Sequence, residues 1–281
     1  DQIDTEVINL DSSKWILKEF QEVQKKYFEN IEKYQFHEIA SLIYHFVWHT
    51  FCDWYIEFIK SDFKDPEKSE ETKKISGWVF VQTLKLLHPI MPFITEKLWI
   101  SLVHKESFLM NQNFIKVNFD KSFDESKKNI LKIIDIMSAL RNLRADLNIS
   151  YKNEIDIIID TENDILKNFI NNYKGEFRRL LKIKSISYNE NTSKNKSAFI
   201  ILNDITILVP LAGIVNIEKE KMKLENKKNT YNEKLKSILE KLNNKTFIEK
   251  APDNVIENFK IQEREIKSSI EKINEIINTI K

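Results

Sequence analysis

Residues 88–99 read His-Pro-Ile-Met-Pro-Phe-Ile-Thr-Glu-Lys-Leu-Trp, and they separate two apolar helical stretches. Proline lacks a backbone N–H and clashes with the preceding turn, so Pro89 ends the helix predicted over residues 67–88. The next helix, predicted from Phe93 to His104, can begin at Pro92, because proline is tolerated at the first helical position. The stretch therefore predicts two helices joined by a sharp break.

Helical periodicity continues on both sides of this break. Residues 12–33 carry one apolar face, with Ser12 or Ser13 as a candidate N-cap, and a longer pattern runs from Phe36 to Phe58. A fifth helical pattern covers residues 130–147. Five helices in about 145 residues predict a helical bundle.

Aromatic residues on these faces are expected to form the core of the bundle. We predict core positions for Trp15, Trp48, Trp54 and Trp99, and Cys52 is interpreted as an inert core thiol. This single cysteine excludes a disulfide framework and a cysteine-rich metal site.

Beyond the bundle the periodicity changes to that of strands. Ile155–Asp160 and residues 183–188 predict strands on either side of a helical stretch, residues 161–181. Residues 198–202 and 205–209 flank Asn-Asp and predict a hairpin. Together these elements predict a small α/β domain.

From residue 214 onward apolar residues recur every seven positions. Two such heptad segments are separated by a short break near residues 243–253, so they are expected to fold back on each other. The predicted fold class is therefore mainly α: a helical bundle, a small α/β domain and an antiparallel coiled-coil hairpin. The expected domains are 1–148, 149–213 and 214–281.

Composition excludes several classes of protein. The 44 basic and 43 acidic residues nearly cancel, so net charge does not indicate nucleic-acid binding. Three glycines cannot build a glycine-rich phosphate loop, and no catalytic constellation is visible. His45 and His49 lack the carboxylate pattern of a zinc site, so we expect no metal ion. No apolar run of membrane-spanning length and no secretory signal occur, which favours a cytoplasmic protein.

The segment 88–99 closely resembles the helix–break–helix element in the anticodon-binding domains of class I aminoacyl-tRNA synthetases for Val, Ile, Leu and Met. Other segments resemble valyl-tRNA synthetases in particular and occur in that family's order, namely residues 14–17, 44–60, 140–149, 209–215 and 241–255.

The resemblance implies the C-terminal region of such a synthetase, with an anticodon-binding bundle, the α/β domain and a tRNA-binding arm. It implies a valine-accepting tRNA as the partner, no DNA and a monomer. In the family, the catalytic signatures and the editing domain precede this region. We therefore expect no activity and no cofactor in this piece, with ATP and Mg²⁺ belonging to a catalytic domain elsewhere.

Unpaired anticodon bases are held by stacking, by guanidinium planes and by hydrogen bonds along their edges. With the resemblance, this favours Arg141 and Arg144, three apart on one predicted helix, as anticodon contacts. Lys14 and Lys18 share a face of the first helix and are candidates for the same RNA. The alternative is that the arginines form salt bridges within the bundle.

In the arm, five cations lie off the predicted apolar seam and are candidates for the tRNA elbow: Lys234, Lys241, Lys245, Lys260 and Arg264. The alternative is a solvated coiled-coil surface. Two other identities stay open. One is the equivalent region of an isoleucyl enzyme, which the lack of a cysteine-rich zinc module disfavours. The other is a non-enzymatic scaffold whose coiled coil binds a protein.

Overall fold

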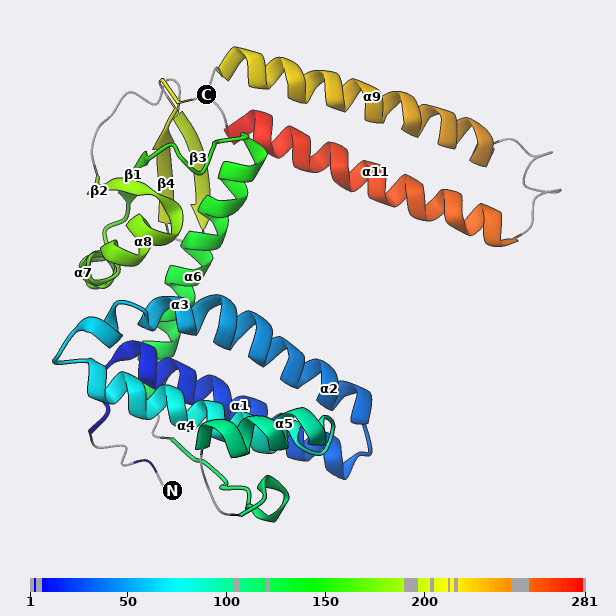
Figure 1. Ribbon diagram of the computed structural model, residues 1–281. Coiled ribbons are helices and arrows are strands. Elements are labelled where there is room, and N and C mark those ends of the chain that lie inside the picture. Colours follow the sequence, from blue (N-terminus) through cyan, green and yellow to red (C-terminus); the bar gives the residue numbers. More distant parts are fainter. Residues whose placement is uncertain are drawn as a thin grey trace. The chain divides into compact units, whose positions relative to one another are not determined.

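The computed structural model of the protein describes residue 3 and residues 7–103, 107–119, 122–189, 197–202, 205–211, 213–214, 217–243 and 253–279. It forms two compact units, residues 1–135 and 136–281. The predicted fold class is confirmed: the chain is mainly helical, with a small mixed sheet and a C-terminal helix pair (Figure 1). The predicted domain boundaries at residues 148 and 213 stay predictions.

The first unit is built around α1 (Asp11–Glu32), whose apolar stripe is buried as predicted. Ile16, Phe20 and Tyr27 are almost completely removed from water, and Trp15 lies beside them. The bundle is completed by elements with the bounds α2 (Phe36–His45), η2 (Phe46–Tyr55), α3 (Ile56–Ile59), η3 (Asp62–Lys64), α4 (Ser69–Leu87), α5 (Pro92–Leu98), η4 (Trp99–Val103) and η5 (Leu109–Asn111).

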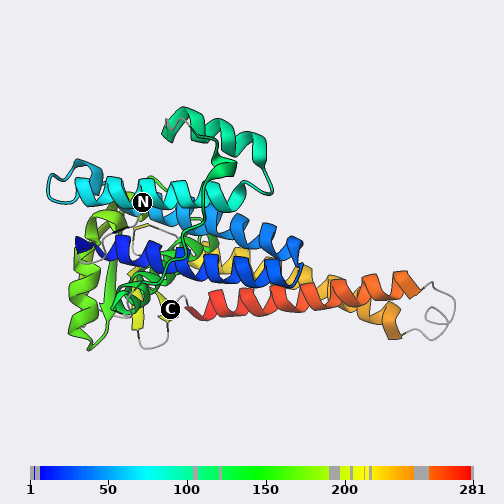
Figure 2. The same cartoon turned by 90° about the horizontal axis from the view of Figure 1, so that it is seen from below.

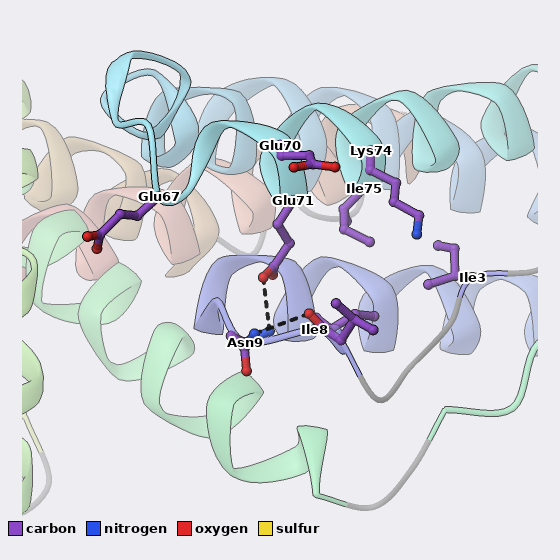
Figure 3. Close-up of a pocket in the computed structure, with 9 residues that line it drawn as sticks. Ile3, Ile8, Asn9, Glu67, Glu70, Glu71, Lys74 and Ile75 are labelled. Carbon is purple, nitrogen blue, oxygen red and sulfur yellow. Dashed lines mark hydrogen bonds between the residues drawn. The ribbon is translucent and has the colours of Figure 1, made fainter.

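The expected serine N-cap of α1 is wrong, because Ser12 and Ser13 lie buried inside the first turn. Two backbone N–H groups before the helix instead bond to Glu71 of α4, and Figure 3 shows the bond from Asn9. The Glu71 carboxylate accepts hydrogen bonds from the N–H of Asn9 at 3.0 Å and of Leu10 at 2.9 Å. A side chain 61 residues away from Leu10 therefore fixes the backbone that leads into α1, while the N-cap residue Leu10 makes no side-chain cap hydrogen bond.

Changing Glu71 to alanine should lower the free energy of unfolding of the first unit by about 1–2 kcal/mol, since the start of α1 loses both acceptors. Glu71→Gln keeps one acceptor and should lose less. Glu70 is exposed and is the matched control, so Glu70→Ala should behave like the unchanged protein. Urea unfolding followed by circular dichroism measures the difference. Equal losses for Glu70→Ala and Glu71→Ala would contradict the stabilising role of these two bonds.

The second predicted helix is continuous in its backbone but contains a π-helical segment, η2, between α2 and α3. In a π-helix the hydrogen bonds span five residues, so each turn holds more residues and the buried face shifts. Phe46 and Tyr55 are buried, whereas Trp48 and Cys52 are exposed. The prediction of core positions for Trp48 and Cys52 is therefore wrong. Trp15 and Trp99 are confirmed as core residues, each 1% exposed.

The break at residues 88–99 is confirmed. α4 ends at Leu87, two residues before Pro89, and Pro92 is the first residue of α5. The thirteen-residue segment after η4 that the structure describes, residues 107–119, returns along α1. Gln24 of α1 holds it by donating to Ile115 O at 2.7 Å and accepting from Val117 N at 2.9 Å.

The long helix α6 (Phe123–Asp146) contains the division between the units, and the sheet follows it. The sheet has the order β2-β1-β4-β3, in which β1 pairs parallel with β2 and antiparallel with β4. The strands are β1 (Ile155–Asp160), β2 (Ile183–Tyr188), β3 (Ser197–Leu202) and β4 (Ile205–Pro210). Two helices connect β1 to β2, namely α7 (Asp164–Asn172) and α8 (Lys174–Leu181). The predicted Asn203-Asp204 turn lies outside the described residues.

The C-terminal helices α9 (Ile217–Asn243) and α11 (Asp253–Thr279) pack side by side, as both Figure 1 and Figure 2 show. Side chains withdrawn from solvent follow the heptad in each helix. In α9 they include Lys221, Leu224, Lys228, Tyr231, Leu235, Ile238 and Leu242, and in α11 they include Ile256, Phe259, Glu263, Ile266, Ile270, Ile273 and Ile277. The predicted helical hairpin is confirmed.

Candidate nucleic-acid interface

Arg144 near the end of α6 does not face solvent. Its side chain is 6% exposed, and burial lowers the pKa of the guanidinium. Nη1 donates to Leu181 O at 3.1 Å, while Nη2 donates to Ser150 O at 2.7 Å and to Asn153 O at 2.8 Å. These bonds leave the guanidinium no open face for an RNA base. We therefore assign Arg144 a structural role in place of the predicted anticodon contact.

The partners of Arg144 also differ from the alternative of salt bridges, because all three are backbone carbonyls. Arg141 stands one helical turn earlier and is exposed. A guanidinium in that position can stack on a base or pair with a phosphate. Arg141 therefore stays a candidate for RNA contact.

Lys18 of α1 is also held inside the protein. Its ammonium lies 2.9 Å from the Asp124 carboxylate and donates to Phe119 O at 3.4 Å. Lys18 is 9% exposed, and its ammonium links α1 to the start of α6. The predicted contact with RNA does not fit this buried position. Lys14, one turn earlier, is half-buried, and no described residue forms an ion pair with it. It stays a candidate.

Four of the five arm candidates, Lys234, Lys241, Lys260 and Arg264, are exposed and lie off the seam. Lys245 lies outside the described residues. Two of the four cations rest on the arm's own rings. The Lys241 ammonium lies 5.0 Å from the centre of the Phe259 ring, and that of Lys234 lies 5.9 Å from the centre of the Tyr231 ring.

Arg264 pairs with Glu257 of its own helix at 3.1 Å. Exposed ion pairs and cation–π contacts of this kind are worth about 1 kcal/mol or less. These contacts orient the cations of the arm, but the cations stay exposed. A phosphate backbone can therefore bind them.

An exposed pair of aromatic rings on α2 and η2 was missed by sequence reasoning. Tyr44 and Trp48 are 57% and 55% exposed, and their rings stack with centroids 6.3 Å apart and an interplanar angle of 4°. Flat exposed rings of this kind can stack on unpaired bases. Trp48 lies four residues after Tyr44 and shares its exposed side of the helix, so the spacing of the two rings was the available signal.

Other kinds of site find no support in the part of the chain that the structure describes. No three side chains of His, Cys, Asp or Glu come together there as a metal site would require. Nor does any helix within those ranges combine the length and the apolar character needed to cross a membrane.

Two protein families match parts of this chain. The family described as the anticodon-binding domain of tRNA ligase matches residues 13–159, and the valyl-tRNA synthetase tRNA-binding arm matches residues 216–281.

Similar curated proteins are valine–tRNA ligases. The chain is 32% identical to that of Pelagibacter ubique over 272 residues, which is 95% of this chain and 31% of the relative. It is 31% identical to that of Aquifex aeolicus over 282 residues, covering 95% of this chain and 24% of the relative. It is 28% identical to that of Listeria innocua over 284 residues, covering 100% and 32%. The chain thus spans about a quarter to a third of these relatives' length. It belongs to the family of tRNA-ligase anticodon-binding domains, followed by a tRNA-binding arm of the valyl-tRNA synthetase kind.

Proposed function

We propose that this chain binds a valine-accepting tRNA for a valine–tRNA ligase, with its helical bundle on the anticodon and its coiled-coil arm on the elbow. The observation that carries the proposal is the succession of the two matches, an anticodon-binding domain and then a valyl-type arm. The relatives named are valine–tRNA ligases, which supports the valyl over the isoleucyl assignment.

The geometry supports a role for this region in recognising tRNA, with the chemical reaction carried out by another part of the ligase. The described surface offers exposed rings on α2 and η2 and exposed cations on the arm, which are groups that bind RNA without reacting with it. We assign activation of valine, with ATP and Mg²⁺, to a part of the ligase beyond these 281 residues. We further propose that the protein works in the cytoplasm as a monomer, without contact to DNA or membrane.

Binding of a panel of tRNA transcripts tests the function. A transcript with a valine anticodon should bind at least about tenfold more tightly than one whose anticodon bases have been changed. Arg141→Ala should weaken binding of the valine transcript by about 1–3 kcal/mol, because the change removes an exposed guanidinium that meets a base or phosphate. The melting temperature of this variant should stay the same, since Arg141 projects from the surface.

Fluorescence anisotropy with labelled transcripts measures both effects on affinity. Equal affinity for every anticodon would remove anticodon recognition from the proposal. Absence of tRNA binding altogether would leave the coiled-coil scaffold as the better account of the chain.

A further inference from the structure

A hollow of about 450 Å³ lies in the first unit, within the range of about 300–1,000 Å³ typical of small-ligand sites. One wall is a single face of α4, and the opposite wall is the segment that follows η5. The lining residues are Gly77, Trp78, Val81, Gln82, Lys85, Trp99, Asn111, Gln112, Asn113 and Ile115. None of them is acidic, and four carry a carboxamide.

The side chain of Gln82 gives this hollow its chemical character. Gln82 is 2% exposed, yet no described residue donates a hydrogen bond to its amide or accepts one from it. The fully buried side-chain atoms that lack a partner among the described residues are Tyr55 Oη and Thr72 Oγ1, so the Gln82 amide is in contact with the solvent of the hollow. A polar group in that position, without a protein partner, is available to a ligand. Gln24, 4% exposed on α1, is the contrasting case, because both ends of its amide are bonded to backbone groups.

The other polar groups around Gln82 are already engaged. Lys85 donates from Nζ to Asn113 O at 3.1 Å, and Trp99 donates from Nε1 to Ser107 O at 2.8 Å. Both bonds join elements that line the hollow. Gln82 therefore lies at a hollow whose other polar side chains are partly occupied by backbone groups, while its own amide has no protein partner.

Gly77 keeps the wall of α4 open. A glycine inside a helix weakens the helix relative to alanine, and a Cβ placed there would meet no atom within 4 Å. The glycine therefore leaves open space at this wall of the hollow. The neighbouring Trp78 ring supplies an aromatic surface on the same wall.

We propose that this hollow receives one unstacked base of the bound tRNA, whose edge pairs with the Gln82 amide. This inference rests on the proposed tRNA-binding function. Every nucleobase carries neighbouring donors and acceptors on its edge, and a carboxamide offers both kinds of group in one plane. The absence of acidic lining residues and the presence of Lys85 suit the polyanion that carries the base.

The isosteric change Gln82→Met separates a binding role from a structural role. It removes an amide that has no protein partner, so the melting temperature should not fall. Affinity for a valine-accepting tRNA transcript should fall about tenfold, because methionine cannot pair with the edge of the base. A structural glutamine would give the reverse: a lower melting temperature with unchanged affinity per folded molecule. That result would overturn the proposal.

Filling the hollow provides a second test that leaves Gln82 in place. Gly77→Leu should also weaken binding of the transcript about tenfold without a decrease in helix signal, because the new side chain enters open space. Gly175→Leu is the matched control, since Gly175 is likewise helical and a Cβ placed there would also meet no atom within 4 Å. It should bind like the unchanged protein.

The outcomes for the hollow and for the proposed function are distinct. If the unchanged protein binds the transcript and both Gln82→Met and Gly77→Leu bind it equally well, the hollow does not hold a tRNA base, and the proposed function stands. If the unchanged protein binds no tRNA, the proposed function fails, and this inference fails with it.

Discussion

Replacing Arg144 by leucine should lower the free energy of unfolding of the second unit by about 3–5 kcal/mol. The guanidinium donates to the carbonyls of Leu181, Ser150 and Asn153, at the end of α8 and in the turn that leads to β1. Leucine leaves all three acceptors without their donor. An unpaired buried carbonyl costs about 1–3 kcal/mol, so the three together amount to a large share of the stability of a domain.

Urea unfolding of the second unit, followed by circular dichroism, measures this change. Arg144→Lys keeps the charge but has only one nitrogen in place of the two that donate, so it should recover part of the stability. Arg141→Ala is the matched control on the exposed side of α6 and should change the free energy by no more than about 0.5 kcal/mol. The structural role of Arg144 is refuted if Arg144→Leu is as stable as Arg141→Ala.

The elements that were predicted best are those whose determinants are local. β1 and β2 begin and end where the sequence predicted, because runs of isoleucine alternate there with polar residues and the flanking residues favour turns. The break after α4 follows from proline chemistry alone. The arm follows from its heptads, which need no information from the rest of the chain.

Features that depend on distant partners could not be predicted. The backbone before α1 is bonded to Glu71, and no pattern near Ser12 or Ser13 indicates that. The π-helical segment η2 changes the number of residues per turn, which a sequence pattern assumes to be constant. Trp48 was assigned to the core as an aromatic residue, but it lies one turn after the exposed Tyr44, and the packing of the other elements decides which side of the helix is covered.

Two of the candidate site residues also have partners that are distant in sequence and could not be predicted. Arg144 and Lys18 were chosen as cations on helical faces, but their partners, Leu181 and Asp124, are 37 and 106 residues away in sequence. Burial by such distant groups decides whether a cation can reach RNA. The arm candidates that the structure describes are exposed, because a two-helix hairpin has few other elements that could cover them.

The arm should account for most of the salt dependence of tRNA binding. Changing Lys241, Lys260 and Arg264 together to glutamine should weaken binding of a whole valine-accepting tRNA about a hundredfold at low salt. Each phosphate that the arm no longer touches keeps its counterion when the complex forms. The slope of log affinity against log salt concentration should therefore become shallower by about two. Glutamine avoids the new repulsion that a glutamate at position 264 would meet from Glu257.

A matched variant tests whether position on the arm matters as well as charge. Lys223, Lys227 and Lys267 are exposed on the same helices, and changing them to glutamine alters the net charge equally. This control should keep most of the affinity and of the salt slope, because a rigid RNA surface meets only one part of the arm. An anticodon stem-loop has no elbow, so it should bind the unchanged protein and both variants alike. Equal decreases in affinity for the two triple variants would mean that the arm attracts RNA by charge alone, and the elbow contact would then be wrong.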